Sequence, residues 1–73
     1  MEINDLIKEL KSLKESLDRI GYSWLYCTGS IKKTHRVLEL LGLVVTDTVG
    51  HEYQIGITNN GYEVLQNWRN YHE

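Results

Sequence analysis

The fold is decided by residues 41–58, which read LGLVVTDTVGHEYQIGIT. Two runs in this stretch, residues 43–49 and 52–57, are rich in valine, isoleucine, threonine and tyrosine, the residue types that favour β-strands. Gly50 and His51 separate the runs, and a two-residue loop that begins with glycine is typical of a type II′ turn. The stretch therefore predicts a β-hairpin.

The length of the hairpin loop sets which side chains face the core. With a two-residue loop, Val44 pairs with Ile57 on the inner face. A three-residue loop would bring Val45 inward instead, because a shift of one residue turns every side chain of a strand to the other face. The sequence is compatible with both registers.

Two helical segments are predicted before the hairpin. Residues 31–41 have the periodicity of an amphipathic helix, with Ser30 as its N-cap and Gly42 at its end. His35 lies on the apolar face of that helix, where we expect a partly buried core histidine; a pH-sensitive element under the helix is the alternative. Residues 23–27 predict a short helical turn.

Helices are also predicted at both ends of the chain. Residues 59–71 follow the hairpin, with Thr58 as their N-cap. Residues 3–20 carry apolar side chains at alternating intervals of three and four, the spacing of a coiled-coil seam. This stripe can pack on the domain's own core, against a second copy of the chain, or partly on both. The residues predicted at a homodimer interface are Ile3, Leu6, Leu10, Leu13, Leu17, Leu40 and Trp68.

The composition predicts one small domain and excludes several classes of protein. The 73 residues, 41% hydrophobic and 25% charged, have an ordinary globular composition in a chain too short for two domains, so residues 1–73 are expected to fold as one unit. The net charge of −2 excludes binding of nucleic acid by bulk positive charge. Cys27 is the only cysteine, which excludes an internal disulfide. Without a long apolar run, we expect a cytoplasmic protein with no membrane partner.

The sequence shows no pattern that indicates catalysis. His35, His51 and His72 fall on a helix face, in a turn and near the end of the chain, without the spacing of metal ligands. The glycines are isolated, so none forms a phosphate-binding loop. We therefore expect a protein that is not an enzyme and that needs no metal or cofactor.

Two motifs flank the predicted hairpin. Residues 30–44 form a predicted helix that runs through Leu-Glu-Leu-Leu-Gly-Leu-Val into the first strand, and residues 53–65 lead from the second strand through Thr-Asn-Asn-Gly into the last helix. In their order and spacing these motifs resemble the winged helix-turn-helix domains of small prokaryotic, archaeal or viral transcriptional regulators. The resemblance implies an α+β, mostly helical fold with three N-terminal helices, a two-stranded wing and a C-terminal helix. Residues 23–27 would then be a short first helix of the helix-turn-helix.

The resemblance implies that the helix over residues 31–41 reads double-stranded DNA. In such domains the first half of the recognition helix enters the major groove. Residues 21–42 hold three basic residues and one acidic residue, and they are the only net-positive third of the chain. Arginine, lysine, serine and threonine are the side chains that commonly contact bases and phosphates. The residues expected to contact DNA are Ser30, Lys32, Lys33, Thr34, Arg36 and, at the hairpin tip, His51.

The predicted wing favours a different partner. It carries Asp47 and Glu52, which would repel a phosphate backbone, where wings commonly carry arginine or lysine. The sequence therefore leaves two functions open. The first is a sequence-specific transcriptional regulator that binds DNA as a homodimer and so presents two recognition helices. The second is a winged-helix module, an adaptor or inhibitor, that contacts another protein and does not bind DNA.

Overall fold

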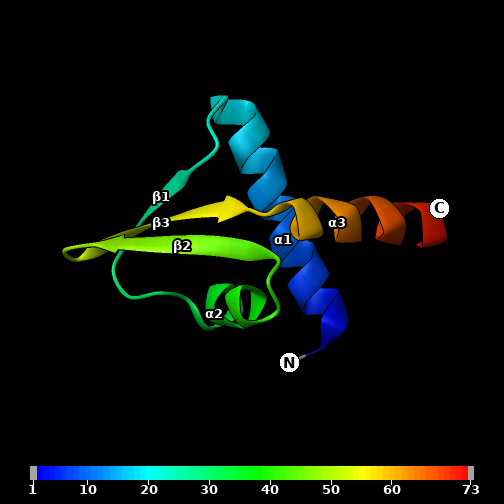
Figure 1. Ribbon diagram of the computed structural model, residues 1–73, viewed down its shortest axis with the longest axis horizontal. Helices are drawn as coiled ribbons and strands as arrows, with labels where there is room; N and C mark the ends of the chain where they lie inside the picture. Colours follow the sequence, from blue (N-terminus) through cyan, green and yellow to red (C-terminus); the bar gives the residue numbers. More distant parts are fainter. Residues whose placement is uncertain (1, 73) are drawn as a thin grey trace.

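The chain folds into three helices and one sheet over the part that the computed structural model describes, residues 2–72 for the backbone and 2–68 for the side chains (Figure 1). The elements in chain order are α1 (Ile3–Ile20), β1 (Leu25–Thr28), α2 (Lys33–Leu40), β2 (Val44–Val49), β3 (Glu52–Ile57) and α3 (Asn59–His72). The sheet is antiparallel, with the strand order β1-β3-β2. The predicted α+β class is confirmed.

The hairpin of β2 and β3 has the predicted two-residue loop. Val44 pairs with Ile57, and Val44 is 3% exposed whereas Val45 is 44% exposed. Gly50 has a φ of 62°, and no residue other than glycine has a positive φ among those described. A type II′ turn needs a positive φ only at its first central residue, so this turn type is confirmed and the three-residue alternative is wrong.

The structure corrects the prediction for residues 23–27, which do not form a helical turn. Residues Leu25–Thr28 form β1, which pairs with β3 so that Leu25 lies opposite Ile55. The physical reason is that the edge of β3 away from β2 offers unpaired backbone groups, and side chains that alternate between half-buried and exposed suit a strand. Two helices therefore precede the hairpin in the described chain, where three were predicted, and the hairpin belongs to a three-stranded sheet.

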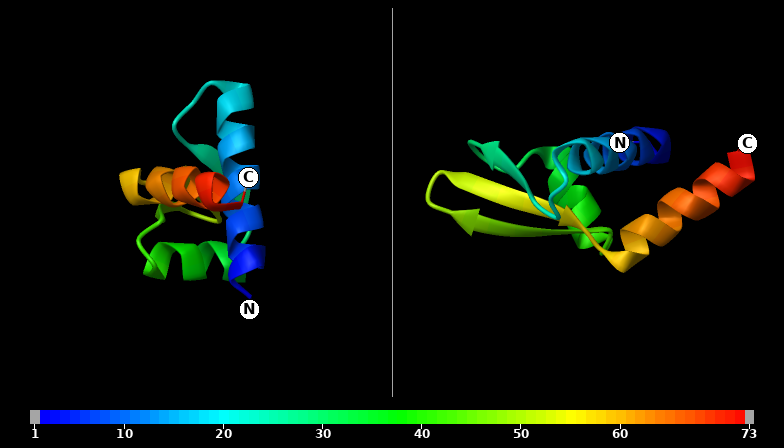
Figure 2. Two further views of the ribbon diagram at one scale, coloured as in Figure 1. Left: turned by 90° about the vertical axis from the view of Figure 1, so that its right-hand side faces the viewer. Right: turned by 90° about the horizontal axis from the view of Figure 1, so that it is seen from above.

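The helix over residues 3–20 has the predicted bounds and provides one half of the core. It ends at Gly21, whose φ is 75° and whose N–H donates to the carbonyl of Leu17. The stripe residues Leu6, Leu10, Leu13 and Leu17 are buried, and the first three pack with residues of α2 and of the sheet. Both α1 and α2 lie on the face of the sheet that carries Val44, Tyr53 and Ile55. α3 follows the end of β3 and packs on the core through Val64 and Leu65, while its C-terminal end points away from the sheet (Figure 2).

The start of α2 also differs from the prediction. The helix begins at Lys33, its N-cap is Lys32, and no side chain forms a capping hydrogen bond, so Ser30 is not the cap. Ser30 belongs instead to a loop that is tied to the hairpin, because the N–H of Gly29 donates to the carbonyl of His51 at 3.0 Å. The predicted end at Gly42 is confirmed by its φ of 77°.

The start of α3 is held against the segment that follows α2. Thr58 Oγ1 accepts a hydrogen bond from the N–H of Gly61 at 3.1 Å, which confirms Thr58 as the N-cap, and the same hydroxyl donates to the carbonyl of Gly42 at 2.7 Å. A Cβ on Gly61 would collide with the carbonyl oxygen of Leu43. The Thr-Asn-Asn-Gly motif is thus explained by a cap at its first residue and a close backbone approach at its last.

Candidate nucleic-acid interface

The basic residues predicted to contact DNA lie at the N-terminal end of α2. Lys32, Lys33 and Arg36 are exposed, and Thr34 is half-buried. Arg36 Nη1 lies 3.3 Å from Glu39 Oε1, one turn along the helix. Neither lysine forms an ion pair with any side chain that the structure describes. The end of α2 therefore presents two free ammonium groups and one guanidinium that is paired only at the surface.

Three of the predicted residues line one shallow hollow of about 470 Å³. Ser30 comes from the loop before α2, Arg36 from α2 and His51 from the hairpin turn. Thr48, on the inner side of β2, lines the hollow between them. The structure thus brings together hydroxyl, guanidinium and imidazole groups, all of which can bind a phosphate oxygen. Lys32, Lys33 and Thr34 lie outside this hollow.

A buried network fixes α2 against α1 and the sheet. His35, which is 3% exposed, projects from α2 and places Nδ1 2.9 Å from the hydroxyl of Tyr53 on β3. On the other side of its ring, Nε2 lies 2.9 Å from Oε1 of Glu9 on α1. The backbone N–H of Lys32 donates to the Tyr53 hydroxyl at 3.4 Å. One imidazole and one phenol therefore join three elements beneath the basic end of α2.

When His35 is neutral, one arrangement of the hydrogen atoms gives every group of this network a hydrogen-bond partner. The Tyr53 hydroxyl accepts from Lys32 N–H and donates to His35 Nδ1, while His35 Nε2–H donates to the Glu9 carboxylate. Burial raises the pKa of Tyr53 above its usual value, opposed by the hydrogen bond from the Lys32 backbone and reinforced by Cys27 and Glu9. Tyr53 therefore stays a neutral donor throughout the physiological pH range.

Two members of this network were not predicted from the sequence. His35 was expected to be a partly buried core histidine; its place in the core is confirmed, but at 3% exposed it is buried more completely than expected. Its partners Glu9 and Tyr53 lie 26 and 18 residues away along the chain, so no local spacing connects them. The sequence did contain one signal for Tyr53. It lies on the inward-facing side of an alternating strand, which places its hydroxyl in the core.

The carboxylates of the hairpin do not face α2. Asp47 lies opposite Gln54, whose Nε2 donates to Asp47 Oδ2 at 3.3 Å, and Glu52 lies opposite Val49. Strand alternation places all four side chains on the face opposite that of Tyr53, and α2 packs on the Tyr53 face. These carboxylates would therefore repel a phosphate backbone at the face of the sheet opposite α2.

The residues predicted at a dimer interface separate into two groups. Leu6, Leu10, Leu13 and Leu17 are buried within the single chain, so burial favours the core interpretation of the stripe over the seam, and their contact with a second copy stays a prediction. The side chains of Ile3 and Leu40 are exposed, and Leu40 is 78% exposed. Trp68 is half-buried. Contact between two copies at these last three positions stays a prediction.

Neither a protein-family model, a curated protein nor a solved structure matches this chain. Within the described residues, no helix has both the length and the apolar character needed to cross a membrane. Among the same residues, no three histidine, cysteine or acidic side chains come together as metal ligands would. Function must therefore be inferred from the geometry of α2, the hairpin and the sheet.

Proposed function

We propose that this chain is a transcriptional regulator that binds double-stranded DNA as a homodimer and reads it with α2. The observation that carries the proposal is the concentration of Lys32, Lys33 and Arg36 at one exposed end of α2, beside a hollow that Ser30 and His51 line. Free cations and polar donors at one place are what a phosphate backbone and the edges of the bases require. The other two thirds of the sequence are each net negative, so this end of α2 is a local positive site.

The chain from α2 to α3 supports a winged-helix type of binding. α2 would be the recognition helix, and the hairpin of β2 and β3 would be the wing. In this proposal β1 and the loop at residues 29–32 take the place of the first helix of a helix-turn-helix. Hydrogen bonds from Gly29 and Lys32 hold that loop on the sheet, and His35 holds α2 on α1. The network thus supplies the rigid support that a preceding helix would otherwise give.

The wing is compatible with DNA on the α2 side. Because Asp47 and Glu52 point to the opposite face of the sheet, they do not stand between α2 and a phosphate backbone. His51 at the tip lies beside Arg36 in the same hollow and can donate to a phosphate. The acidity of the wing then reduces the affinity for DNA only through longer-range repulsion, which salt screens over about 8–10 Å.

Dimerisation would supply the affinity that so few cations cannot provide alone. Leu40 and Ile3 are large apolar side chains that are exposed in the single chain, and exposed apolar surface commonly marks an interface. A two-fold dimer would double the phosphate contacts and place two reading helices on a pseudo-palindromic site. The predicted half-site spacing is about one DNA turn, roughly 34 Å.

The proposal is tested by fluorescence anisotropy with a labelled mixed-sequence duplex at two salt concentrations. We expect the Lys33→Ala/Arg36→Ala double variant to bind much more weakly than the wild type. Its salt dependence should also be shallower, by about 0.9 in the log–log slope for each phosphate that it no longer neutralises. The matched control is Lys8→Ala/Lys11→Ala, which removes the same charge from exposed positions of α1. Equal losses of affinity in the two double variants, or no binding by the wild type at low salt, would contradict the proposal.

A second function, contact with another protein, is favoured by a different part of the molecule. The sheet face opposite α2 carries exposed aromatic and aliphatic side chains together with Asp47 and Glu52. An apolar patch with a charged rim is typical of a protein-binding surface. If the anisotropy titration shows no DNA binding, this face becomes the main functional candidate.

A further inference from the structure

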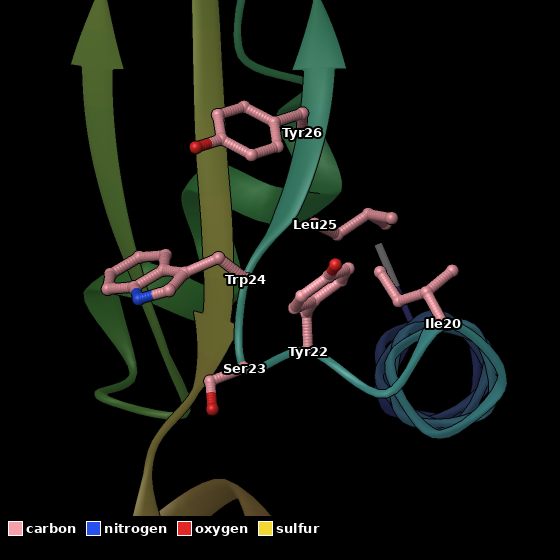
Figure 3. Close-up of a pocket in the computed structure, with 6 residues that line it drawn as sticks. All are labelled: Ile20, Tyr22, Ser23, Trp24, Leu25 and Tyr26. Carbon is pink, nitrogen blue, oxygen red and sulfur yellow. The ribbon is translucent and has the colours of Figure 1, made fainter.

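The strand register defines the uncovered face of the sheet, here called the outer face. Val45 lies opposite Gly56 and Asp47 opposite Gln54 across β2 and β3, and Tyr26 lies opposite Gln54 across β1 and β3. Alternation therefore places these side chains on one side and the core residues on the other. Figure 3 shows the result: Trp24 and Tyr26 lie in front of β3, and α2 lies behind the sheet.

Gly56 gives room for the backbone of Ser23 and lies next to the indole of Trp24 on this face. A Cβ on Gly56 would lie 3.5 Å from the ring of Trp24 and 2.9 Å from the carbonyl oxygen of Ser23. The absence of a side chain lets the Ser23 carbonyl approach β3, and the ring of Trp24 lies against the strand near Tyr26. The two rings form an aromatic surface in the middle of the outer face, and the backbone of β1 and β3 fixes its position.

The aromatic surface is accessible and continues into a hollow. Tyr26 is 73% exposed, and Tyr22, Val45 and Val49 are also exposed. The hollow next to β1 has a volume of about 720 Å³ and is lined by Ile20, Tyr22, Ser23, Trp24, Leu25 and Tyr26. It is mostly apolar, with the tyrosine hydroxyls at its surface (Figure 3). Packed helices occupy the other face of the sheet, so this one is free to receive a partner.

The strand residues of the outer face carry only negative charge. Asp47 and Glu52 are its ionised strand residues, and no residue of the three strands is lysine or arginine. Gln54 donates to one oxygen of Asp47, which leaves the second oxygen free to accept. Carboxylates beside the faces of tryptophan and tyrosine are complementary to an ammonium or guanidinium group, which both a carboxylate and a π-face attract.

We propose that the outer face binds a cationic segment of a partner protein. Lysine or arginine side chains of that segment lie over the rings of Tyr26 and Trp24 and bind Asp47, while an adjoining apolar side chain enters the hollow beside β1. Negative charge makes the same face unfavourable for nucleic acid. Because α2 lies on the other side of the sheet, DNA and the partner can be bound at the same time.

The test is a binding titration with three labelled peptides that differ only in charge, alternating valine with arginine, glutamine or glutamate. We expect the arginine peptide to bind and the glutamate peptide not to bind. Tyr26→Ala/Asp47→Asn should weaken binding of the arginine peptide about tenfold, because the double variant removes one cation–π interaction and one ion pair. Tyr62→Ala, at an exposed tyrosine of α3, is the matched control and should bind as the wild type does. Circular dichroism of each variant checks that these exposed substitutions leave the fold intact.

The outcomes separate this proposal from DNA binding. Lys33→Ala/Arg36→Ala should keep the affinity for the arginine peptide, whatever its effect on DNA. Equal binding of all three peptides would show an apolar surface without charge selectivity and would overturn the proposal. So would the absence of peptide binding together with self-association that Tyr26→Ala abolishes, because the occupant would then be a second copy of the chain.

Discussion

Replacement of Tyr53 by phenylalanine removes the buried hydroxyl that links His35 and the start of α2 to the sheet. The hydroxyl accepts from Lys32 N–H and donates to His35 Nδ1, and the ring itself is buried. Phenylalanine retains the ring, so no large cavity forms, but the buried His35 Nδ1 loses its partner. An unsatisfied buried polar group costs about 1–3 kcal/mol, and the Lys32 N–H adds less because that residue is near solvent. We expect Tyr53→Phe to lower the free energy of unfolding by about 2 kcal/mol.

Urea unfolding at neutral pH measures this loss, with Tyr26→Phe as the matched control. Tyr26 is exposed and forms no hydrogen bond through its side chain in the described structure, so its substitution should change stability by less than about 0.5 kcal/mol. Equal effects of the two substitutions would refute the idea that the Tyr53 hydroxyl supports α2. If the Tyr53→Phe variant is less stable but binds DNA with the affinity of the wild type, then the Tyr53 hydroxyl stabilises the fold without positioning α2 for DNA binding.

The comparison of the wild type with Tyr53→Phe also gives a prediction for alkaline pH. Burial raises the pKa of Tyr53 in the folded chain, whereas in the unfolded chain it ionises near the ordinary value of about 10. The unfolded chain therefore binds fewer protons above that pH, and the free energy of unfolding falls as pH rises. The contribution is complete below about pH 10 and is lost as pH rises through the folded-state pKa. The stability difference between wild type and Tyr53→Phe should shrink in this range; a difference that stays constant through about pH 11 would contradict the assignment.

Two further substitutions test the packing and the dimer. Gly61→Ala places a Cβ against the carbonyl oxygen of Leu43, so we expect a loss of more than about 2 kcal/mol in urea unfolding, whereas Asn60→Ala at an exposed neighbouring position should be nearly neutral. Leu40→Asp should leave the fold of the single chain intact by circular dichroism, because the side chain is exposed there, but should shift a dimer to monomer in sedimentation velocity; an unchanged dimer would exclude Leu40 from the interface.

The hairpin and α1 could be predicted from the sequence because their signals are local. A glycine-first loop between two β-prone runs predicted the hairpin and limited it to two registers, of which the structure has the pairing of Val44 with Ile57. An unbroken apolar stripe predicted the bounds of α1. The pairing also decides that Asp47 faces away from α2, since its neighbour Thr46 bonds to Glu39 of that helix. The face of the sheet on which the acidic residues lie therefore follows from the sequence once the loop length and the core face are known.

Strand β1 and the buried network could not be predicted in the same way. Four residues that alternate in burial are too short for a periodic signal, and Leu25–Thr28 become a strand because β3 has a free edge to pair with. Ser30 is a good N-cap residue by type, but the loop that holds it is tied to the hairpin by the hydrogen bond from Gly29 to His51, and α2 begins at Lys33. For the candidate site, the sequence identified the basic residues of α2, while their support by Glu9 and Tyr53 depends on contacts between distant segments.

The most direct test of α2 as a reading helix is a map of backbone amide shifts on titration of a mixed-sequence DNA duplex into the labelled protein. We predict that the largest shifts fall on residues 30–36 and on His51, which lie at or beside the same hollow. Residues of the outer face, such as Tyr26 and Val45, should not change. Shifts confined to that outer face, or none at low salt, would contradict the central claim that α2 binds DNA.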